Sequence, residues 1–260
     1  MFKNLRFWAP TTSKDEFEVK IALLKKCKPT RPLYAHKLIN LAKDIVLFYT
    51  KTPSQSNFDN ANKLLWTLAA MLTSWSVANK SNLHSSNSDN QGNTPLHLIS
   101  QLCFEACYQN PQGLSSWKAI NGVKGYENFT LSGPISYMFS MLVNKLNVNQ
   151  QNANGETPLH ILSGAYEKDL IPEPVPVVTE LCLGFNAFCI LLGNGADITI
   201  EDNKQQSCYS LASEYRSENE LKELIHQMKS YNCWIQYWED LGNKIKDRGV
   251  NEIKSRKLKI

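Results

Sequence analysis

Two histidines of the chain occur in nearly the same sequence context and are its first candidates for chemistry. His97 lies in "GNTPLHLIS" and His160 lies in "GETPLHILS", so the same motif occurs twice with a spacing of 63 residues. An imidazole side chain is able to bind a metal or to act as a general base near neutral pH. The duplication therefore indicates either a duplicated chemical site or one structural unit that is used twice.

The neighbouring residues give little support to catalysis or metal binding. Cys103 and Cys107 are four residues apart and follow His97, but a structural zinc ion needs four ligands and this stretch is a poor source of them. The sequence contains no P-loop and no G-x-S-x-G, H-E-x-x-H or G-x-G-x-x-G motif. A cysteine–histidine nucleophile pair stays open, because its members need not be close in sequence. We therefore predict no catalytic residue, no metal and no cofactor, and enzymatic activity is disfavoured but undecided.

Each copy of the motif predicts a turn, a cap and a helix. Thr94 is suited to accept a first-turn N–H as an N-cap, and Pro95 suits the first helical position. Leu96 and Ile99 are three residues apart and share one helix face. The second copy repeats the pattern with Thr157, Pro158, Leu159 and Leu162, and Gly92 and Gly155 suit turns with a positive φ angle.

The segments "DNQGNTPLH" and "QNANGETPLH" resemble the ankyrin repeat, whose signature is a hairpin turn followed by T-P-L-H. "CILLGNGADITIEDNKQQSCYSLASE" is similar to the end of one such repeat and the start of the next, with Ser207 to Ser210 in place of T-P-L-H. The resemblance covers residues 83–230 and implies three repeats. It implies a structural role for the histidine, which hydrogen-bonds the backbone between neighbouring repeats in the family. The structural motif residues are Thr94, Pro95, His97, Thr157, Pro158 and His160.

The implied fold is an all-α ankyrin-repeat solenoid with N- and C-terminal helical caps and two long interhelical insertions. Ordinary repeats recur at about 33 residues, whereas Thr94 to Thr157 spans 63 and Thr157 to Ser207 spans 50. We expect the extra residues at about 104–133 and 166–181, between the first and second helix of a repeat. The first insertion carries Trp117, a large aromatic residue whose presence argues against an entirely disordered loop. Such insertions either cover exposed repeat surface or bind a partner.

Residues 1–82 predict an N-terminal helical region. Its apolar stripes at helical spacing are Phe17 to Leu24, Leu38 to Phe48 and Leu64 to Trp75. Trp66 lies on the opposite side of the third stripe, so we expect that helix to be buried between neighbours. Residues 30–80 are either a degenerate repeat, with Arg31 of "TRPLYAHKLINLAKD" aligned to Thr94, or an unrelated helical cap.

Residues 231–260 predict a C-terminal helical cap and a basic tail. The last twenty residues hold seven Lys/Arg and two Asp/Glu, whereas the whole chain has a net charge of +4. The tail could be solvated, contact an anionic membrane surface weakly, or serve as a secretion signal. With 42% hydrophobic and 20% charged residues the chain is typical of a folded protein, and it shows no transmembrane segment or signal peptide. Seven cysteines without a C-x-x-C pair indicate a reducing compartment.

The resemblance implies protein binding through the concave surface made by turn tips and first helices. The predicted partner-binding residues are Gln91, Asn93, Gln101, Trp117, Asn154, Glu156, Tyr166, Lys204 and Gln206. Decayed repeats, large insertions and the basic tail resemble ankyrin-repeat effectors of intracellular bacteria such as Legionella. This implies host proteins as partners, no nucleic-acid partner, and action in the host cytoplasm after type IV secretion. If the chain is no effector, we expect a cytoplasmic protein.

Two other functions stay open at the level of the sequence. The first is an enzyme whose site is built from the insertions and flanking helices, with the repeats recruiting its target. The second is a eukaryotic or viral adaptor. In addition, Asn149 in "MLVNKLNVN" resembles the asparagine that a host asparaginyl hydroxylase modifies in ankyrin repeats.

Overall fold

The chain folds as stacked α-helices. The structure, a computed structural model, describes residues 14–28, 33–50, 55–79, 88–108, 132–163, 183–213, 217–219, 222–223 and 225–226. Its helices are α1 (Lys14–Lys25), α2 (Tyr34–Thr50), α3 (Gln55–Ala78), α4 (Pro95–Tyr108), α6 (Ser132–Leu142), α7 (Pro158–Ile161), α8 (Leu183–Gly193) and α9 (Cys208–Ser213). Within these residues the only strand-like pairing is one isolated bridge between Glu201 and Ser207. The prediction of an all-α protein is confirmed.

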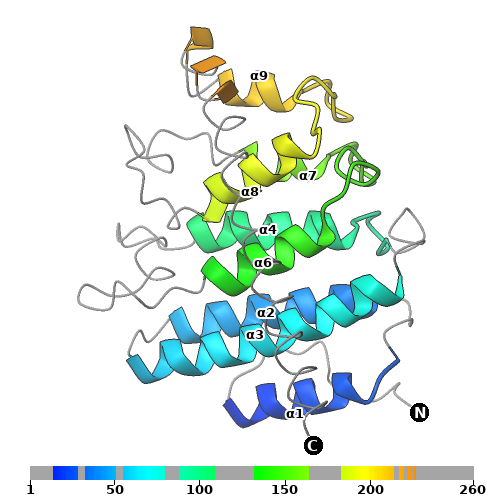
Figure 1. The fold of residues 1–260 in the computed structure, drawn as a ribbon. Helices are drawn as coiled ribbons and strands as arrows, with labels where there is room; N and C mark the ends of the chain where they lie inside the picture. The colour runs from blue at the N-terminus through cyan, green and yellow to red at the C-terminus, as the bar shows by residue number, and fades with distance from the viewer. Residues whose placement is uncertain are drawn as a thin grey trace, which may run out of the picture.

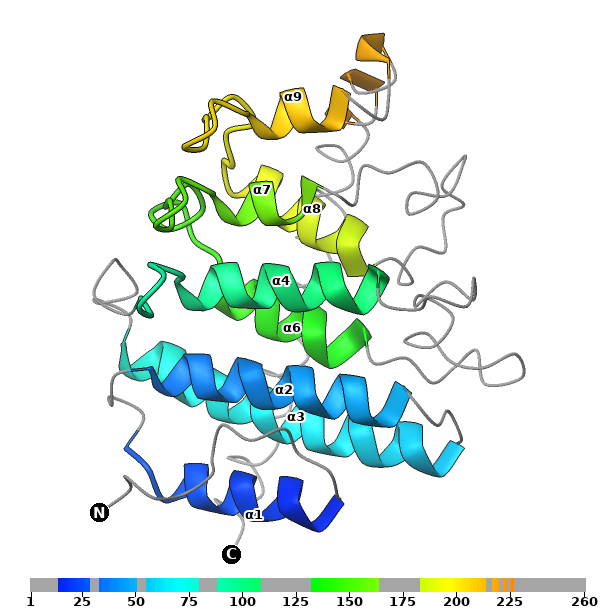
Figure 2. The ribbon, with the colours of Figure 1, turned by 180° about the vertical axis from the view of Figure 1, so that it is seen from behind.

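The helices form two columns (Figure 1). In the first column α2 packs on α4 and α4 packs on α7, and in the second column α3 packs on α6 and α6 packs on α8. The two columns are held together by contacts of α2 with α3 and of α4 with α6 and α8. Figure 2 shows the same levels from behind, with α1 at one end against α2 and α3 and with α9 at the other end.

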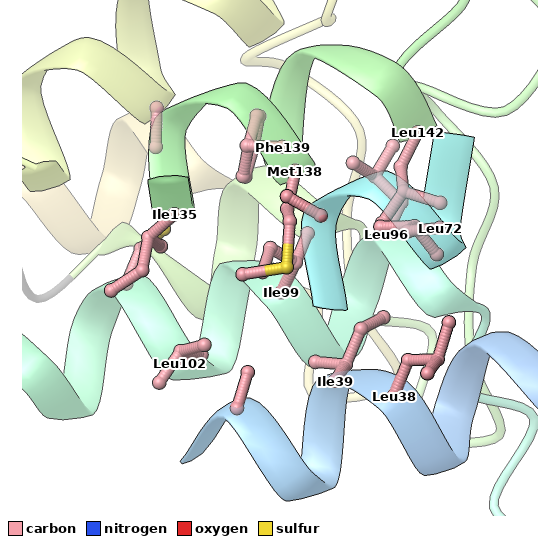
Figure 3. Packing of buried hydrophobic residues seen from close by; sticks show 14 of the residues in the cluster. Leu38, Ile39, Leu72, Leu96, Ile99, Leu102, Ile135, Met138, Phe139 and Leu142 are labelled. Atoms are coloured by element: carbon pink, nitrogen blue, oxygen red, sulfur yellow. The ribbon is translucent and has the colours of Figure 1, made fainter. Parts of the chain in front are cut away.

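One hydrophobic core runs through the whole stack, from Phe17 on α1 to Ala212 on α9. Figure 3 shows its middle, where the side chains of four helices interdigitate. The residues labelled there are Leu38 and Ile39 of α2, Leu72 of α3, Leu96, Ile99 and Leu102 of α4, and Ile135, Met138, Phe139 and Leu142 of α6. Burial of each such side chain contributes about 1.5–3 kcal/mol to folding. The core is continuous across the boundary predicted near residue 82, because α4 and α6 pack directly on α2 and α3.

The three apolar stripes of the N-terminal region face this core, as predicted. Phe17, Ile21 and Leu24 of α1 are buried, as are Leu38 to Ile45 at the stripe positions of α2 and Leu64 to Trp75 at those of α3. The Phe17 ring meets the Phe48 ring edge-on, with 5.4 Å between the ring centroids. The repeated contact of rings and aliphatic groups fixes α1 against the end of the stack.

The expected burial of the other side of α3 holds only for Ala69, which is buried, whereas Trp66 and Ala70 are exposed. Trp66 is 45% exposed. It lies on the side of α3 that faces the surface of the second column. The Trp66 ring lies against Tyr137 of α6, with 5.6 Å between the ring centroids, and close to Gly133 of the same helix. This side of α3 is therefore partly covered by α6.

The boundaries of the insertions differ from those predicted. Helix α4 continues to Tyr108 and α6 begins at Ser132, so both ends of the predicted 104–133 insertion are helical. Phe104 continues the apolar face of α4 and packs against the core, which explains why the helix does not end there. The predicted insertion at 166–181, the residues Trp117 and Tyr166, and the C-terminal cap and tail at 231–260 lie outside the described residues.

Candidate functional site

Three hairpin turns of the same conformation line one side of the stack: turn 1 (residues 89–93), turn 2 (residues 152–156) and turn 3 (residues 202–206). In each turn the N–H of the first residue donates to the carbonyl of the fifth, at 2.9–3.0 Å. The side-chain oxygen of the first residue, which is Asp or Asn, accepts the N–H groups of the third and fifth residues at 2.8–3.0 Å. This use of Asp and Asn as internal acceptors is the reason that these residues favour turns.

The backbones of consecutive turns are joined to each other. The N–H of Ala153 donates to the carbonyl of Gln91 at 2.9 Å, and the N–H of Asn203 donates to the carbonyl of Asn154 at 3.0 Å. The three turns therefore form one continuous surface, here called the turn row, which lies along one edge of the helical stack (Figures 1 and 2).

The close approach of the turns requires glycine in the first two. Gly92 and Gly155 have φ angles of 75° and 77°. A Cβ atom on Gly92 would lie 2.8 Å from the backbone nitrogen of Ala153, and one on Gly155 would lie 2.7 Å from that of Asn203. The predicted need for a positive φ angle is confirmed, and contact with the next turn adds a steric reason that the sequence did not show.

Turn 3 departs from this rule. Gln205 stands at the glycine position with a φ angle of 60°. Its Cβ atom occupies the side of the turn on which a further turn would pack, by analogy with Gly155. Among the described turns, turn 3 is therefore the one that leaves no room for a following turn.

His97 joins α4 to turn 2. Its Nδ1 atom accepts the backbone N–H of Thr94 at 3.2 Å and also lies 2.8 Å from the hydroxyl of that threonine. Because Nδ1 is an acceptor, the proton of the neutral ring is on Nε2, which donates to the carbonyl of Glu156 at 3.0 Å. The ring is fully buried, and this desolvation lowers the pKa of His97 below its ordinary value.

His160 makes the same set of contacts one level further on. Its Nδ1 atom accepts the N–H of Thr157 at 3.1 Å, and its Nε2 atom lies 3.1 Å from the carbonyl of Gln206 in turn 3. Thr157 is the N-cap of α7, and Pro158 follows it at the first helical position. In both copies the two ring nitrogens are used inside the fold, so neither is left to bind a metal or to move a proton.

His36 makes a third junction that the predicted register does not include. Its Nε2 atom donates to the carbonyl of Asn93 in turn 1 at 2.8 Å, so it corresponds to His97 at a spacing of 61 residues. The alignment of Arg31 with Thr94 is therefore shifted by two residues. Leu33, with a φ angle of 59°, precedes α2 and takes the place of the capping threonine. Without a hydroxyl at that place, Nδ1 of His36 is buried with no hydrogen-bond partner.

The last copy replaces the threonine and histidine by two serines. The N–H of Ser207 donates to the hydroxyl of Ser210 at 2.8 Å, and the N–H of Ser210 donates to the hydroxyl of Ser207 at 3.0 Å. These bonds cap α9 as the Thr–His pair caps the earlier helices. A serine side chain does not extend to a following turn, which agrees with the blocked glycine position in turn 3.

The predicted partner-binding residues fall into four groups. Gln91, Gln101, Asn154 and Lys204 are exposed, whereas Glu156 and Gln206 are half-buried. Asn93 is only 9% exposed. The reason is that its amide group hydrogen-bonds Asp89 and Asn152, so it serves the junction between two turns rather than an outside surface. Trp117 and Tyr166 lie outside the described residues.

Two exposed asparagines of the turns were missed from the sequence, namely Asn90 and Asn203. They hold the second position of turn 1 and turn 3, next to the predicted Gln91 and Lys204. Their place in the repeated five-residue pattern was the signal that could have identified them, because equivalent positions of equivalent turns face the same way.

Asn149 lies at the junction of two levels. Its amide donates to the carbonyl of Gly195 at 3.0 Å and accepts the N–H of Asp197 at 2.8 Å. Both ends of this amide are therefore used to connect successive levels of the stack. A modifying enzyme that needs this side chain would first have to break these two bonds.

Within the part of the chain that the structure describes, no group of three or more His, Cys, Asp or Glu side chains is placed to hold a metal ion. Cys27, Cys103, Cys189 and Cys208 form no disulfide bond, and the last three are buried. No described helix has the length and apolar character required to cross a bilayer.

Comparisons with known proteins found no family model that matches the chain and no curated protein that matches it. The turn row and its histidine junctions are therefore the features from which a function is inferred.

Proposed function

We propose that the chain is an ankyrin-type repeat protein that binds another protein through the turn row and the adjoining first-helix column. The observation that carries this proposal is the backbone connection of three equivalent turns into one surface. Stacked repeats use such continuous surfaces to contact adjacent parts of a partner.

The distribution of exposed groups supports the same surface. The third residue of each turn, Gln91, Asn154 or Lys204, is exposed. In contrast, the side-chain oxygen of the first residue of each turn accepts a hydrogen bond from the turn's own backbone. The exposed side chains are thus carried on a rigid scaffold, which favours binding because little order has to be gained on association.

We also propose that the partner is a host-cell protein and that the chain is a bacterial effector. The support is in the sequence, in its divergent repeats and its basic C-terminal segment. A fusion of the full chain to a translocation reporter tests this proposal. Entry into host cells that requires a type IV secretion system is the expected result, and entry that is independent of the system would contradict it.

Substitutions in the turn row test the binding surface. We expect Gln91→Ala, Asn154→Ala and Lys204→Ala to reduce the amount of a specific partner that the full chain captures from host-cell lysate, measured by quantitative mass spectrometry. Lys63→Ala is the matched control for Lys204→Ala, because Lys63 is exposed on α3 in the other column. Capture that depends on Lys63 and not on the turn row would overturn the proposal.

A further inference from the structure

The hairpins that carry the turn row are strongly acidic. Residues 88–93, 149–156 and 197–206 contain five acidic residues against one lysine, which gives them a net charge of −4. The five carboxylates are those of Asp89, Glu156, Asp197, Glu201 and Asp202. Since the whole chain has a net charge of +4, all other residues together carry +8. Negative charge is therefore concentrated along one edge of a chain that is otherwise positive.

The negative charge of these hairpins is not neutralised by the described residues around them. Elsewhere Glu16 forms an ion pair with Lys20 at 3.4 Å, but in the described part of the chain none of the five hairpin carboxylates pairs with a lysine or arginine. Asp197 and Glu201 are exposed, and the other three are half-buried. Their hydrogen bonds come from uncharged groups, such as the two N–H groups that Asp89 accepts. These bonds use only part of the acceptor capacity of a carboxylate, so a cation is still able to bind.

The hydrogen bonds within the hairpins favour the charged form of their carboxylates. The hydroxyl of Thr199 donates to Asp197 at 2.7 Å, which lowers the pKa of that carboxyl group below its ordinary value. Burial raises the pKa of Asp202, but the bonds from the N–H groups of Gln206 and Lys204 outweigh it, so this pKa is also lowered. Both groups are therefore ionised at neutral pH, and the backbone bonds between consecutive turns hold the acidic hairpins side by side.

The same chain contains a segment of opposite charge that is able to reach this edge. Residues 241–260, here called the basic segment, hold seven Lys/Arg and two Asp/Glu, a net charge of +5, and lie outside the described residues. The described chain continues from turn 3 through α9 to residue 226. The connecting residues 227–240 extend to about 50 Å at most. Three stacked levels of helices span only about 20 Å, so every turn of the row is within reach.

We infer that the basic segment binds along the turn row of its own chain, with its lysine and arginine side chains against the hairpin carboxylates. The charges of the two parts, +5 and −4, are opposite and nearly equal. Tethering gives the segment an effective concentration of about 1 mM at the row, so even a weak contact is well populated. Exposed ion pairs are individually weak and are screened by salt, so the contact is reversible. The segment covers the surface proposed above for partner binding, and a partner has to displace it.

Zero-length coupling with a carbodiimide tests this contact in the full chain. The reagent joins a lysine amine to an Asp or Glu carboxylate only where the two groups touch, and mass spectrometry identifies the coupled pair. Equal amounts of unlabelled and isotopically labelled chain distinguish coupling within one chain from coupling between two chains. We expect links within one chain from lysines of the basic segment to Glu156 and Glu201. Their yield should fall about threefold or more between about 0.05 M and 0.5 M sodium chloride, because salt screens the attraction.

Asparagine removes the charge at the start of a turn and keeps its hydrogen-bond acceptor. Turn 2 begins with Asn152, whose Oδ1 atom accepts the same two N–H groups as the carboxylates of Asp89 and Asp202 do in the other turns. The double variant Asp89→Asn/Asp202→Asn therefore keeps the turns and changes the net charge of the hairpins from −4 to −2. We expect the links from the basic segment to Glu156 and Glu201, which the variant retains, to decrease about threefold.

The matched control is Glu18→Gln/Asp59→Asn, which removes two exposed carboxylates from α1 and α3 and should leave these links unchanged. Links between differently labelled chains would overturn the inference in favour of contact with a second copy. Links of the basic segment mainly to Glu18 or Asp59, no links from this segment, or links that Asp89→Asn/Asp202→Asn does not reduce would also overturn it. None of these results bears on the proposed function, which the capture of a partner by the turn-row variants tests separately.

Discussion

The middle of the stack and its two ends differ in how one level is joined to the next. In the middle, His97 has partners on both ring nitrogens, one set within its own helix cap and one in the following turn. At the first junction His36 keeps only the bond to the following turn. At the last copy Ser210 keeps only the cap. Capping a helix and connecting it to the following turn are therefore two separate functions. In the middle of the stack a single histidine performs both.

The glycine position shows the same contrast. Gly92 and Gly155 leave room for a following turn, whereas Gln205 fills that room. The full set of residues therefore occurs only where a turn is followed by another turn.

The largest effect is expected at Gly155. An alanine there would combine a positive φ angle of 77° with a Cβ atom 2.7 Å from the backbone of turn 3. We expect Gly155→Ala to lower the free energy of unfolding by about 3–4 kcal/mol, measured by urea denaturation. Gly195→Ala is the control, because Gly195 has a φ angle of 88° but nothing within 4 Å of the added atom. It should cost only about 1 kcal/mol, and equal losses would show that packing between turns is unimportant.

The next largest losses of stability are expected at the histidine junctions. His97→Ala leaves the N–H of Thr94 without a partner, removes one of the two hydrogen bonds to the carbonyl of Glu156 and deletes a fully buried ring, so we expect a loss of about 2–3 kcal/mol. His36→Ala removes one hydrogen bond to the carbonyl of Asn93, which keeps its bond from the N–H of Asp89, and should cost about 1 kcal/mol. Thermal and urea unfolding of the two variants compare the junctions directly. An equal or larger loss for His36→Ala would contradict the ranking of middle over end.

Acid should weaken both junctions. Burial lowers the pKa of His36 and of His97 below the ordinary value of 6.5. As the pH falls below 6.5, the unfolded chain takes up protons that the folded chain does not, so the free energy of unfolding decreases down to the folded pKa values. The limit is about 1.4 kcal/mol per pH unit for each histidine. Between pH 7 and pH 5.5 we expect a loss of about 1.5 kcal/mol.

The control for this pH dependence is the double variant His36→Ala/His97→Ala, which should lose clearly less stability over the same interval. Asp197 does not obscure the comparison in this window. The hydrogen bond from Thr199 lowers the pKa of Asp197 below its ordinary value of 3.8, so that its contribution is lost only at lower pH. A slope unchanged in the double variant would show that other groups cause the acid sensitivity.

The smallest effect, and the only gain, is expected at Gln205. Glycine adopts a φ angle of 60° without the strain of a Cβ atom, so Gln205→Gly should raise the free energy of unfolding by about 0.5–1 kcal/mol. No following turn is present in the described residues to lose or gain contacts. If the variant is destabilised instead, the Gln205 side chain contributes to the end of the row in a way that outweighs its strain.

Several features of this molecule could be read from its local sequence. The turn glycines, the Thr–Pro starts of two helices and the apolar stripes of α1, α2 and α3 were predicted, because each depends on residues within a few positions of one another. Trp66 was misplaced, since its exposure depends on which column α3 joins. The role of His36 was missed because Leu33 removes the threonine that marks the other copies.

What the sequence determined by itself is the conformation of each turn and the start of each helix, because caps and φ preferences act over four or five residues. The packing of these units against one another was decided only by the tertiary structure. The contact of Gly155 with turn 3 and the bond of His36 to Asn93 join residues about 50 positions apart or more. The orientation of the amide groups of Gln91, Asn154 and Asn203 likewise depends on the hydrogen bonds around them, because either end of an amide is able to face the surface until its neighbours hold one of them.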